Sequence, residues 1–364
     1  MTADEIDKYL AGIKVCDPAI GSGAFPVGMM TEIVRARNAL TPFIQNKNRS
    51  VYNFKRECIE NSLYGVDIDP GAVEIAKLRL WLSLVVDEDD IKQIKPLPNL
   101  DYKIVCGNSL IGVDKQDLFK SHLLEQLEKI KPLYFNETNP TKKQEYKIQI
   151  NGLITQITNG HLDFDFEIYF SEIFHEKGGF DVLIANPPYV GQKGNKNLFS
   201  ALSKDLNFEK KMDYWYFFLH KAHELNKNNG ITTFITPNYW VTANGAKKLR
   251  EKIINGYYFI EQINFNENNI FEAGVHTNVF ILQKSSYKNK SILCTIYNNQ
   301  YESDFINHKD TEFCFFADQN KISPKWTGFI HFLPNDILVI INKLVLNCEK
   351  LSDNESIGVN TKGL

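Results

Sequence analysis

The chain has 364 residues, of which 43% are hydrophobic, so it can bury a sizeable core in one large or two smaller domains. Its 41 basic and 44 acidic side chains give a formal net charge of −3, which excludes a polycation that grips nucleic acid with its whole surface. Either positive charge is localised, or another part of a larger molecule supplies it. The sequence contains no membrane-length apolar run and no signal peptide, so we expect a cytoplasmic protein without a membrane partner.

Short apolar runs alternate with helix-like segments from Lys14 to about Lys284. This alternation predicts a doubly wound α/β fold, with a mostly parallel, seven-stranded sheet covered by helices on both faces. Strands are expected at residues 13–16, 63–68, 103–106, 180–185, 231–236, 259–265 and 278–283. Helices are expected at residues 71–85, 215–226 and 245–255, where apolar residues recur at helical spacing.

Residues 114–177 interrupt this rhythm with polar, helix-prone sequence that is too long for an ordinary connection, and we interpret them as an insertion. Beyond residue 284 the sequence is rich in Asn, Tyr and Phe, with one amphipathic stretch at 336–346. We therefore expect a first domain over residues 1–284, then a linker and an incomplete further region over 285–364. The six cysteines show no CxxC pair or metal-ligand spacing, and we interpret all of them as structural.

The first motif, KVCDPAIGSGAF, is an apolar strand that ends at Asp17 and enters a glycine-containing turn before a helix. Gly21 and Gly23 permit positive φ and close approach to a ligand, and Asp17 can hold an ammonium group. Pro26 stands where a dinucleotide fingerprint has its third glycine. The turn therefore favours a nucleoside with an amino-acid tail over a phosphate, although an ordinary strand-to-helix turn is the alternative.

The second motif, LYGVDIDPGAVEIAKLRL, ends a strand at Asp67 and starts a helix after Asp69. An acid at the tip of the second strand of such a fold can accept both hydroxyls of a ribose, and we assign this role to Asp67. Ile68 would then pack on an adenine face. In the alternative interpretation, Asp69 caps the helix and Asp67 is a solvated strand end.

The third motif, GGFDVLIANPPYVG, places Asn186, Pro187, Pro188 and Tyr189 after an apolar strand. The two prolines leave the carbonyls of Asn186 and Pro187 outside any regular ladder, where they can accept from a substrate amine. Two such acceptors favour a pyramidal nitrogen whose lone pair is available for reaction. Tyr189 offers a flat face for an extruded base. A proline-rich turn would explain the prolines but not the Asn at the strand tip.

With these three motifs in this order, the chain resembles the amino-methyltransferase class of DNA methyltransferases, and within it the adenine-modifying group. It is most similar to the methyltransferase parts of fused type II restriction-modification enzymes of the Eco57I type, which carry phrases like DPAIGSGAF, YGVDIDP and GGFDVLIANPPYV. The resemblance implies a Rossmann-like fold that depends on S-adenosylmethionine. It also implies transfer of a methyl group to the N6 amine of a flipped-out adenine in double-stranded DNA, within a restriction-modification system.

The same resemblance implies roles for individual residues. Asn186, Pro187 and Tyr189 would be catalytic, with Phe271 stacking on the base opposite Tyr189. The residues implied to bind S-adenosylmethionine are Asp17, Ala19, Gly21, Gly23, Asp67, Ile68, Asn108, Ser109 and Phe218. Asn108 stands where the family usually has an Asp, so its amide oxygen can accept a hydrogen bond but carries no charge. Methyl transfer from a sulfonium needs no metal, and we expect none.

Two of these aromatic residues also have a simpler explanation. The run that contains Phe218 is more typical of a core helix than of a binding face, and Phe271 could simply be buried. His220 and His223 have no convincing metal partners.

The resemblance also implies further domains. About a dozen residues precede the first strand, where the family has a helix that completes the cofactor pocket, so we interpret the N-terminal side as truncated. The ending GVNTKGL resembles the entrance to a target-recognition domain. The one ExK triplet that we credit, Glu209 to Lys211, lies in the loop after the third motif, so we infer no nuclease in the chain and expect one in a larger parent protein.

Other functions remain compatible with these residues. Any planar NH2 group presents the same geometry, so an RNA base amine or a protein glutamine is an alternative substrate. A non-catalytic scaffold that kept the fold is another alternative, indicated by Asn108 and the short N-terminus. Five lysines between Gly191 and Lys211 could contact phosphates or form a solvated face.

Overall fold

The computed structural model of the chain describes residues 1–45, 49–86, 100–112, 118–137, 139–158, 164–266, 270–271, 274–285, 291–297, 311–323 and 329–347. The ending that resembles the entrance to a target-recognition domain, residues 358–364, lies outside these ranges. No helix within the described ranges combines the length and the apolar character needed to cross a membrane.

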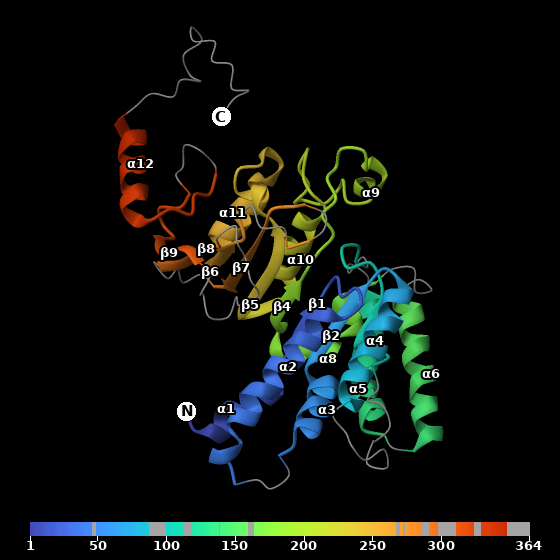
Figure 1. Cartoon of the computed structure of the whole chain (residues 1–364). Helices are drawn as coiled ribbons and strands as arrows, with labels where there is room; N and C mark the ends of the chain where they lie inside the picture. The colour runs from blue at the N-terminus through green and yellow to red at the C-terminus, as the bar shows by residue number, and fades with distance from the viewer. Residues whose placement is uncertain are drawn as a thin grey trace.

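Within the described ranges, the centre of the molecule is one nine-stranded sheet in the order β3-β2-β1-β4-β5-β7-β6-β8-β9 (Figure 1). Its strands are β1 (Val15–Asp17), β2 (Leu63–Asp67), β3 (Ile104–Cys106), β4 (Phe180–Ala185), β5 (Asn226–Pro237), β6 (Tyr257–Asn264), β7 (Thr277–Lys284), β8 (Ser291–Tyr297) and β9 (Thr311–Asp318). The first five are parallel neighbours, and β7 runs antiparallel between β5 and β6. The doubly wound α/β fold with a mostly parallel sheet is therefore confirmed.

The prediction of seven strands is wrong by two. All seven expected strands are present, and β8 and β9 extend the sheet beyond β6. β8 pairs with β6 in parallel, and a parallel neighbour carries no hairpin signal in the sequence. Both added strands come from the region that we expected to be a linker, while the division into residues 1–284 and 285–364 stays a prediction.

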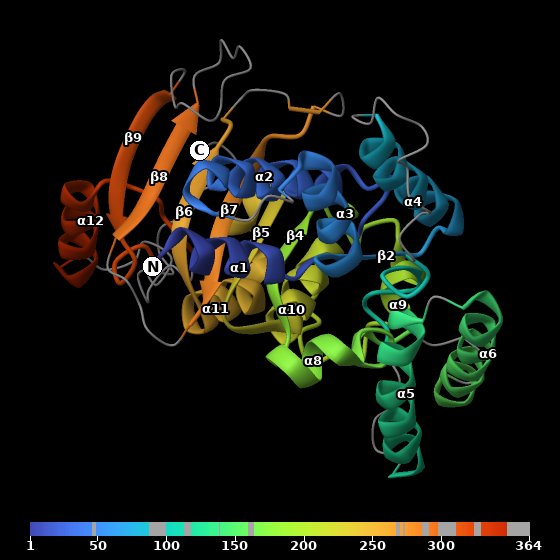
Figure 2. The ribbon, with the colours of Figure 1, turned by 90° about the horizontal axis from the view of Figure 1, so that it is seen from below.

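Helices cover both faces of the sheet (Figure 2). On one face, a core cluster is shared by α2 (Ala24–Ala39), α3 (Val51–Asn61) and α4 (Pro70–Val85). On the other face, a second cluster includes residues of α5 (Leu118–Asn136), α6 (Pro140–Ile157), α7 (Phe166–Tyr169), α8 (Ser171–Lys177), α10 (Trp215–Leu225) and α11 (Lys247–Gly256). The other helices include α1 (Ala3–Gly12), α9 (Lys196–Ser200) and α12 (Asn335–Asn347).

The direction of winding changes at β1, which fixes where ligands can bind. β1 pairs with β2 on one side and with β4 on the other, and the chain continues outward from each. Ligands of open α/β sheets bind at such a switch point, beyond the carboxyl ends of the strands. Asp17, Asp67 and Asn186 stand at or directly after those ends.

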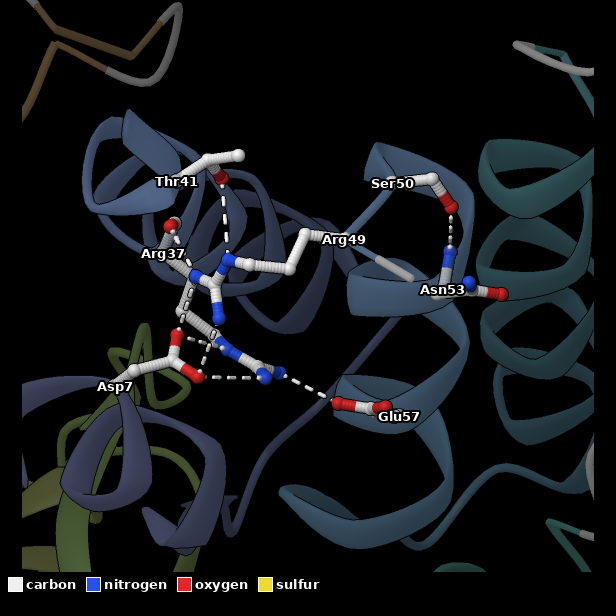
Figure 3. Close-up of polar contacts among 7 residues, drawn as sticks. All are labelled: Asp7, Arg37, Thr41, Arg49, Ser50, Asn53 and Glu57. Atoms are coloured by element: carbon white, nitrogen blue, oxygen red, sulfur yellow. Dashed lines mark hydrogen bonds and ion pairs between the residues drawn. The ribbon is translucent and has the colours of Figure 1, made fainter. Parts of the chain in front are cut away.

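A network of ionic hydrogen bonds connects α1 to α2 and α3 (Figure 3). Asp7 of α1 accepts from Arg37 Nε at 3.0 Å and from both terminal nitrogens of Arg49 at 2.8 and 2.9 Å. Arg37 also donates to Glu57 of α3 at 2.8 Å. Both guanidinium groups are almost fully buried, so each depends on its carboxylate partner.

We predict that Asp7→Asn destabilises the protein by roughly 2–4 kcal/mol at neutral pH, because it leaves two buried arginines short of an anion. The arginines lower the pKa of Asp7 from 3.8 to about 2. The stabilisation is therefore complete above the unfolded-state pKa and is lost as the pH falls through the folded-state value. Urea unfolding at pH 7 and near pH 2 measures the effect, with the exposed Asp205→Asn as control. A gap between Asp7→Asn and wild type that stays constant across this range would contradict the assignment.

Candidate functional site

The turn after β1 contains a buried carboxylate with spare acceptor capacity. Asp17 is 1% exposed, and its Oδ1 accepts from the Ala19 backbone N–H at 2.9 Å. Its Oδ2 is buried and has no hydrogen-bond partner among the residues that the structure describes. Burial raises the pKa of Asp17 to about 8, and the nearby charge of Asp67 adds to this rise, whereas the Ala19 N–H opposes it. A cation placed at Oδ2 would offset this burial and favour the charged form of Asp17.

Glycine is required in this turn by conformation and by space. Gly21 and Gly23 have φ of 52° and 80°, in the left-handed region that other residues rarely adopt. Gly23 is the N-cap of α2, and a Cβ there would lie 3.0 Å from Ala76 Cβ on α4. The turn can therefore bring its backbone close to a ligand while α2 packs tightly on α4.

Asp67 connects the turns after β1 and β2. Its Oδ2 accepts from the Gly21 N–H at 2.8 Å and its Oδ1 from the Asp69 N–H at 3.0 Å. Asp69 caps α4 by accepting from Gly71 N–H at 2.8 Å, as the alternative interpretation of this motif expected. Asp67, however, is not a loose strand end, because each of its oxygens holds a turn and still has room for a further donor. Next to it, Ile68 exposes 69% of its surface.

The turn after β3 joins the same edge. Gly107 N–H donates to the Asp67 carbonyl at 2.8 Å, and the buried Ser109 hydroxyl donates to the Pro18 carbonyl at 2.6 Å. The Asn108 side-chain oxygen accepts from the Leu110 N–H at 3.0 Å. Ser109 thus connects the turn after β3 to the turn after β1, whereas the side-chain oxygen of Asn108 accepts a hydrogen bond within its own turn.

The four residues after β4, Asn186 to Tyr189, are here named the tetrad. They line a cavity of about 250 Å³, here named the tetrad pocket. Asn186 is exposed and makes no hydrogen bond through its side chain within the described part of the chain. The Tyr189 hydroxyl donates to the Ile235 carbonyl of β5 at 2.9 Å, which fixes its ring, and burial raises its pKa. The residues that line the pocket are Asn186, Pro187, Pro188, Tyr189, Phe271 and Val275.

Phe271, which is distant in sequence from Tyr189, lines the tetrad pocket together with it. Its ring centroid is 6.4 Å from that of Tyr189, with the two planes inclined at 64°. The structure thus brings together the two aromatic residues that the sequence analysis paired. Phe218 lies deeper: it is buried on α10 and packs against Tyr214 at 6.0 Å, in the same core cluster as Ala185 at the end of β4. Its contact with a cofactor stays a prediction.

One acid near the pocket was missed by the sequence analysis. Asp213 is buried and accepts from the hydroxyl of Tyr239, and its burial raises its pKa. It pairs with Gly191 in an isolated antiparallel bridge, just after the tetrad. Gly191 ends the third motif, but Asp213 belongs to none of the three motifs and lies 22 residues further along, so only the folded chain reveals the pair.

His220 and His223 lie on α10, where burial lowers the pKa of each to about 4. In the part of the chain described above, no group of three His, Cys, Asp or Glu side chains is placed to hold a metal ion.

The switch-point turns and the Asn-Pro-Pro-Tyr pocket lie at the carboxyl ends of neighbouring strands, which is the arrangement of a ligand-binding protein of the doubly wound α/β class. The family model of the Eco57I restriction-modification methylase matches residues 61–271. This match covers more than half of the chain, and the chain belongs to that family.

Named relatives are much longer than this chain. It is 26% identical to the putative type II restriction enzyme and methyltransferase RM.MjaORFECS2P of Methanocaldococcus jannaschii, over 99% of this chain and 37% of the relative. It is 25% identical to the type II restriction enzyme and methyltransferase RM.Eco57I of Escherichia coli, over 78% of this chain and 26% of the relative.

Solved structures share the fold. The type IIL restriction-modification enzyme MmeI, solved in complex with DNA, superposes with a TM-score of 0.50 at 15% identity, covering 81% of this chain and 34% of its own. A chain of a type I R-M system superposes with a TM-score of 0.51 at 11% identity, covering 95% and 61%. At these identities the likeness concerns the fold.

We predict that the stability of the protein depends on pH through Asp17. Because its folded-state pKa lies above the ordinary value of 3.8, ionisation favours the unfolded chain, and stability falls as the pH rises from about 4 to about 8. Asp17→Asn removes this dependence, so the variant should gain stability relative to wild type across that interval. Urea unfolding at both ends of the interval measures the gain, with the exposed Asp205→Asn as control. The same difference between variant and wild type at both pH values would refute the raised pKa.

Proposed function

We propose that this chain is the catalytic domain of an adenine-specific DNA methyltransferase from a restriction-modification system, acting in the cytoplasm. The observation that carries the proposal is the tetrad pocket, where Asn186 and Tyr189 lie beside a turn that holds a buried, half-satisfied carboxylate. An amine acceptor, an aromatic face and a cation site at one switch point are the parts that methylation of a base amine needs.

The residues at the switch point fit S-adenosylmethionine. We propose that Asp17 Oδ2 accepts from its ammonium group, that Gly21 and Gly23 admit its methionine end, and that Asp67 accepts from its ribose. The exposed Ile68 would cover the adenine, and Ala19 of the turn after β1 with Asn108 and Ser109 of the turn after β3 would complete the wall, with Phe218 beneath. The cofactor supplies a methyl group activated on a sulfonium.

The residues of the tetrad pocket then prepare the target amine. The side-chain oxygen of Asn186 and the carbonyl of Pro187 accept hydrogen bonds from its two N–H groups, which favours a pyramidal nitrogen and frees its lone pair. Tyr189, fixed by Ile235, offers one rigid face to the base, and Phe271 closes the opposite side. In the structure these two rings are inclined to each other at 64°, so we propose that Phe271 turns to face Tyr189 when the base enters.

The longer relatives support a proposal about the whole protein. Both are named as restriction enzyme and methyltransferase, and this chain spans 37% and 26% of their lengths. We propose that residues 1–284 are the catalytic domain, and that 285–364 lead toward a target-recognition domain in a parent protein that also carries a nuclease. Double-stranded DNA is the proposed partner.

The proposal predicts transfer of labelled methyl from S-adenosylmethionine to unmethylated mixed-sequence DNA, with the label recovered as N6-methyladenine after digestion to nucleosides. Asn186→Ala should abolish the label, because it removes the side chain at the strand tip and loosens the acceptor geometry. Cofactor binding by this variant, measured by calorimetry, should match wild type. Label in RNA or in protein glutamine, with none in DNA, would replace the proposed substrate by one of the alternatives.

Stacking in the tetrad pocket predicts a graded series at Tyr189. Tyr189→Ala should raise KM for DNA about 5- to 150-fold, since stacking contributes roughly 1–3 kcal/mol per base. Tyr189→Phe keeps the ring but loses the bond to Ile235, so it should stay within about 5-fold of wild type. Phe271→Ala should resemble Tyr189→Ala. Equal kinetics for the Phe and Ala variants of Tyr189 would show that its ring does not stack on the substrate.

A further inference from the structure

The loop that follows the tetrad, residues 191–211, is here named the lysine loop. It starts two residues after Tyr189, and Gly191 pairs with Asp213 across its base. Gln192 adds two hydrogen bonds at the base of the loop: its side-chain oxygen accepts from the Lys211 N–H at 2.7 Å, and its own N–H donates to the Met212 carbonyl at 3.1 Å. The loop therefore projects from the rim of the tetrad pocket (α9, upper right of Figure 1).

The lysine loop concentrates positive charge on a chain whose net charge is −3. It has five lysines and two acidic residues, Asp205 and Glu209. Glu209 already accepts from the backbone N–H of Lys248 at the start of α11, at 2.7 Å. All five lysines have exposed side chains: Lys193, Lys196, Lys204, Lys210 and Lys211. Charge that the composition left unplaced thus gathers beside the pocket, where it complements a phosphate backbone.

Leu206 stands out from this loop with 90% of its surface exposed. It occupies the tip of a turn in which Phe208 N–H donates to the Asp205 carbonyl at 3.0 Å and Asn207 N–H to Asp205 Oδ1 at 2.7 Å. Lys248 Nζ donates to the carbonyls of Leu206 and Phe208 at 2.5 and 3.0 Å. Such tips usually hold Gly, Asn, Asp, Ser or Pro, so the geometry of the turn does not call for a leucine.

Two other apolar residues of the lysine loop are buried in the core, whereas Leu206 is exposed. Phe199 and Leu202 are 1% and 5% exposed and belong to the main core cluster. The Phe199 ring packs edge-on against Tyr214 at 5.6 Å. An apolar side chain that could have joined this core is instead held in solvent by a rigid turn.

We propose that Leu206 is an apolar wedge that enters the base stack of DNA next to the target adenine, while lysines of the loop hold the flanking phosphates. The inference rests on the proposed function. Extruding a base costs a few kcal/mol, and apolar side chains inserted between base steps unstack them. A turn already fixed by Asp205 and Lys248 loses little entropy when it inserts. The surrounding lysines favour DNA over an apolar protein surface as its partner.

The test compares methyl transfer on two duplexes that carry the sequence found methylated in mixed DNA. In one the target adenine is paired with thymine; in the other it lies opposite an abasic position and is already loosened. Leu206→Ala should lower the single-turnover rate about 10- to 100-fold on the paired duplex and less than about 3-fold on the abasic one. Leu206→Met, which keeps an apolar wedge, should remain near wild type on both.

The outcomes separate the wedge from the proposed function. A wild-type protein that methylates neither duplex would overturn the proposed function and the wedge with it. Wild-type activity together with an unchanged Leu206→Ala rate on the paired duplex would overturn the wedge alone. An equal loss on both duplexes would also overturn it, because Leu206 would then serve docking, to DNA or to a protein, and not extrusion.

The phosphate contacts have their own readout in binding. Lys204→Gln with Lys210→Gln should weaken binding equally on both duplexes and reduce the slope of log affinity against log salt by about 2. Lys8→Gln on α1, at the opposite end of Figure 1, is the matched control and should leave the slope unchanged. A slope unaltered by the double substitution would overturn the role of these lysines.

Discussion

The pairing of β1 with β2 on one side and β4 on the other is the constraint on which the rest of the structure depends. β1 is only three residues long and wholly buried, yet its pairing with β2 and β4 aligns the carboxyl ends of these strands. Because these strands are parallel, Asp17, Asp67 and Asn186 reach one edge of the sheet from segments far apart in sequence. Hydrogen bonds between the turns, centred on Asp67, then hold that edge as one rigid rim.

At Asp17, stability and the proposed ligand-binding role oppose each other. A buried carboxylate with one unpartnered oxygen is costly, since burial without pairing disfavours the charged form. The same oxygen is what an ammonium ligand would need, so the fold keeps a local destabilisation that a ligand can relieve. Asp7 on α1 is the contrasting case, because two arginines donate hydrogen bonds to both of its oxygens and lower its pKa.

The rim is also pre-organised around the tetrad pocket. Tyr189 is fixed through Ile235, and the lysine loop through Lys248, so neither has to be ordered on binding. A net charge of −3 is compatible with DNA as the proposed partner because charge is distributed unevenly, with five exposed lysines within one loop at this rim. The whole-chain composition averages this feature away.

The sequence by itself determined the alternation of strands and helices, and the three motifs at strand ends, because apolar periodicity and glycine or proline chemistry act locally. It could not reveal β8 and β9, since β8 pairs in parallel with β6 and no local turn announces that pairing. Nor could it show that the Tyr239 hydroxyl donates to Asp213, or that Leu206 is held clear of the core. Those contacts join residues separated along the chain, or depend on which side chains the core leaves outside. Only tertiary packing decides them, since strand order and burial are properties of the whole fold.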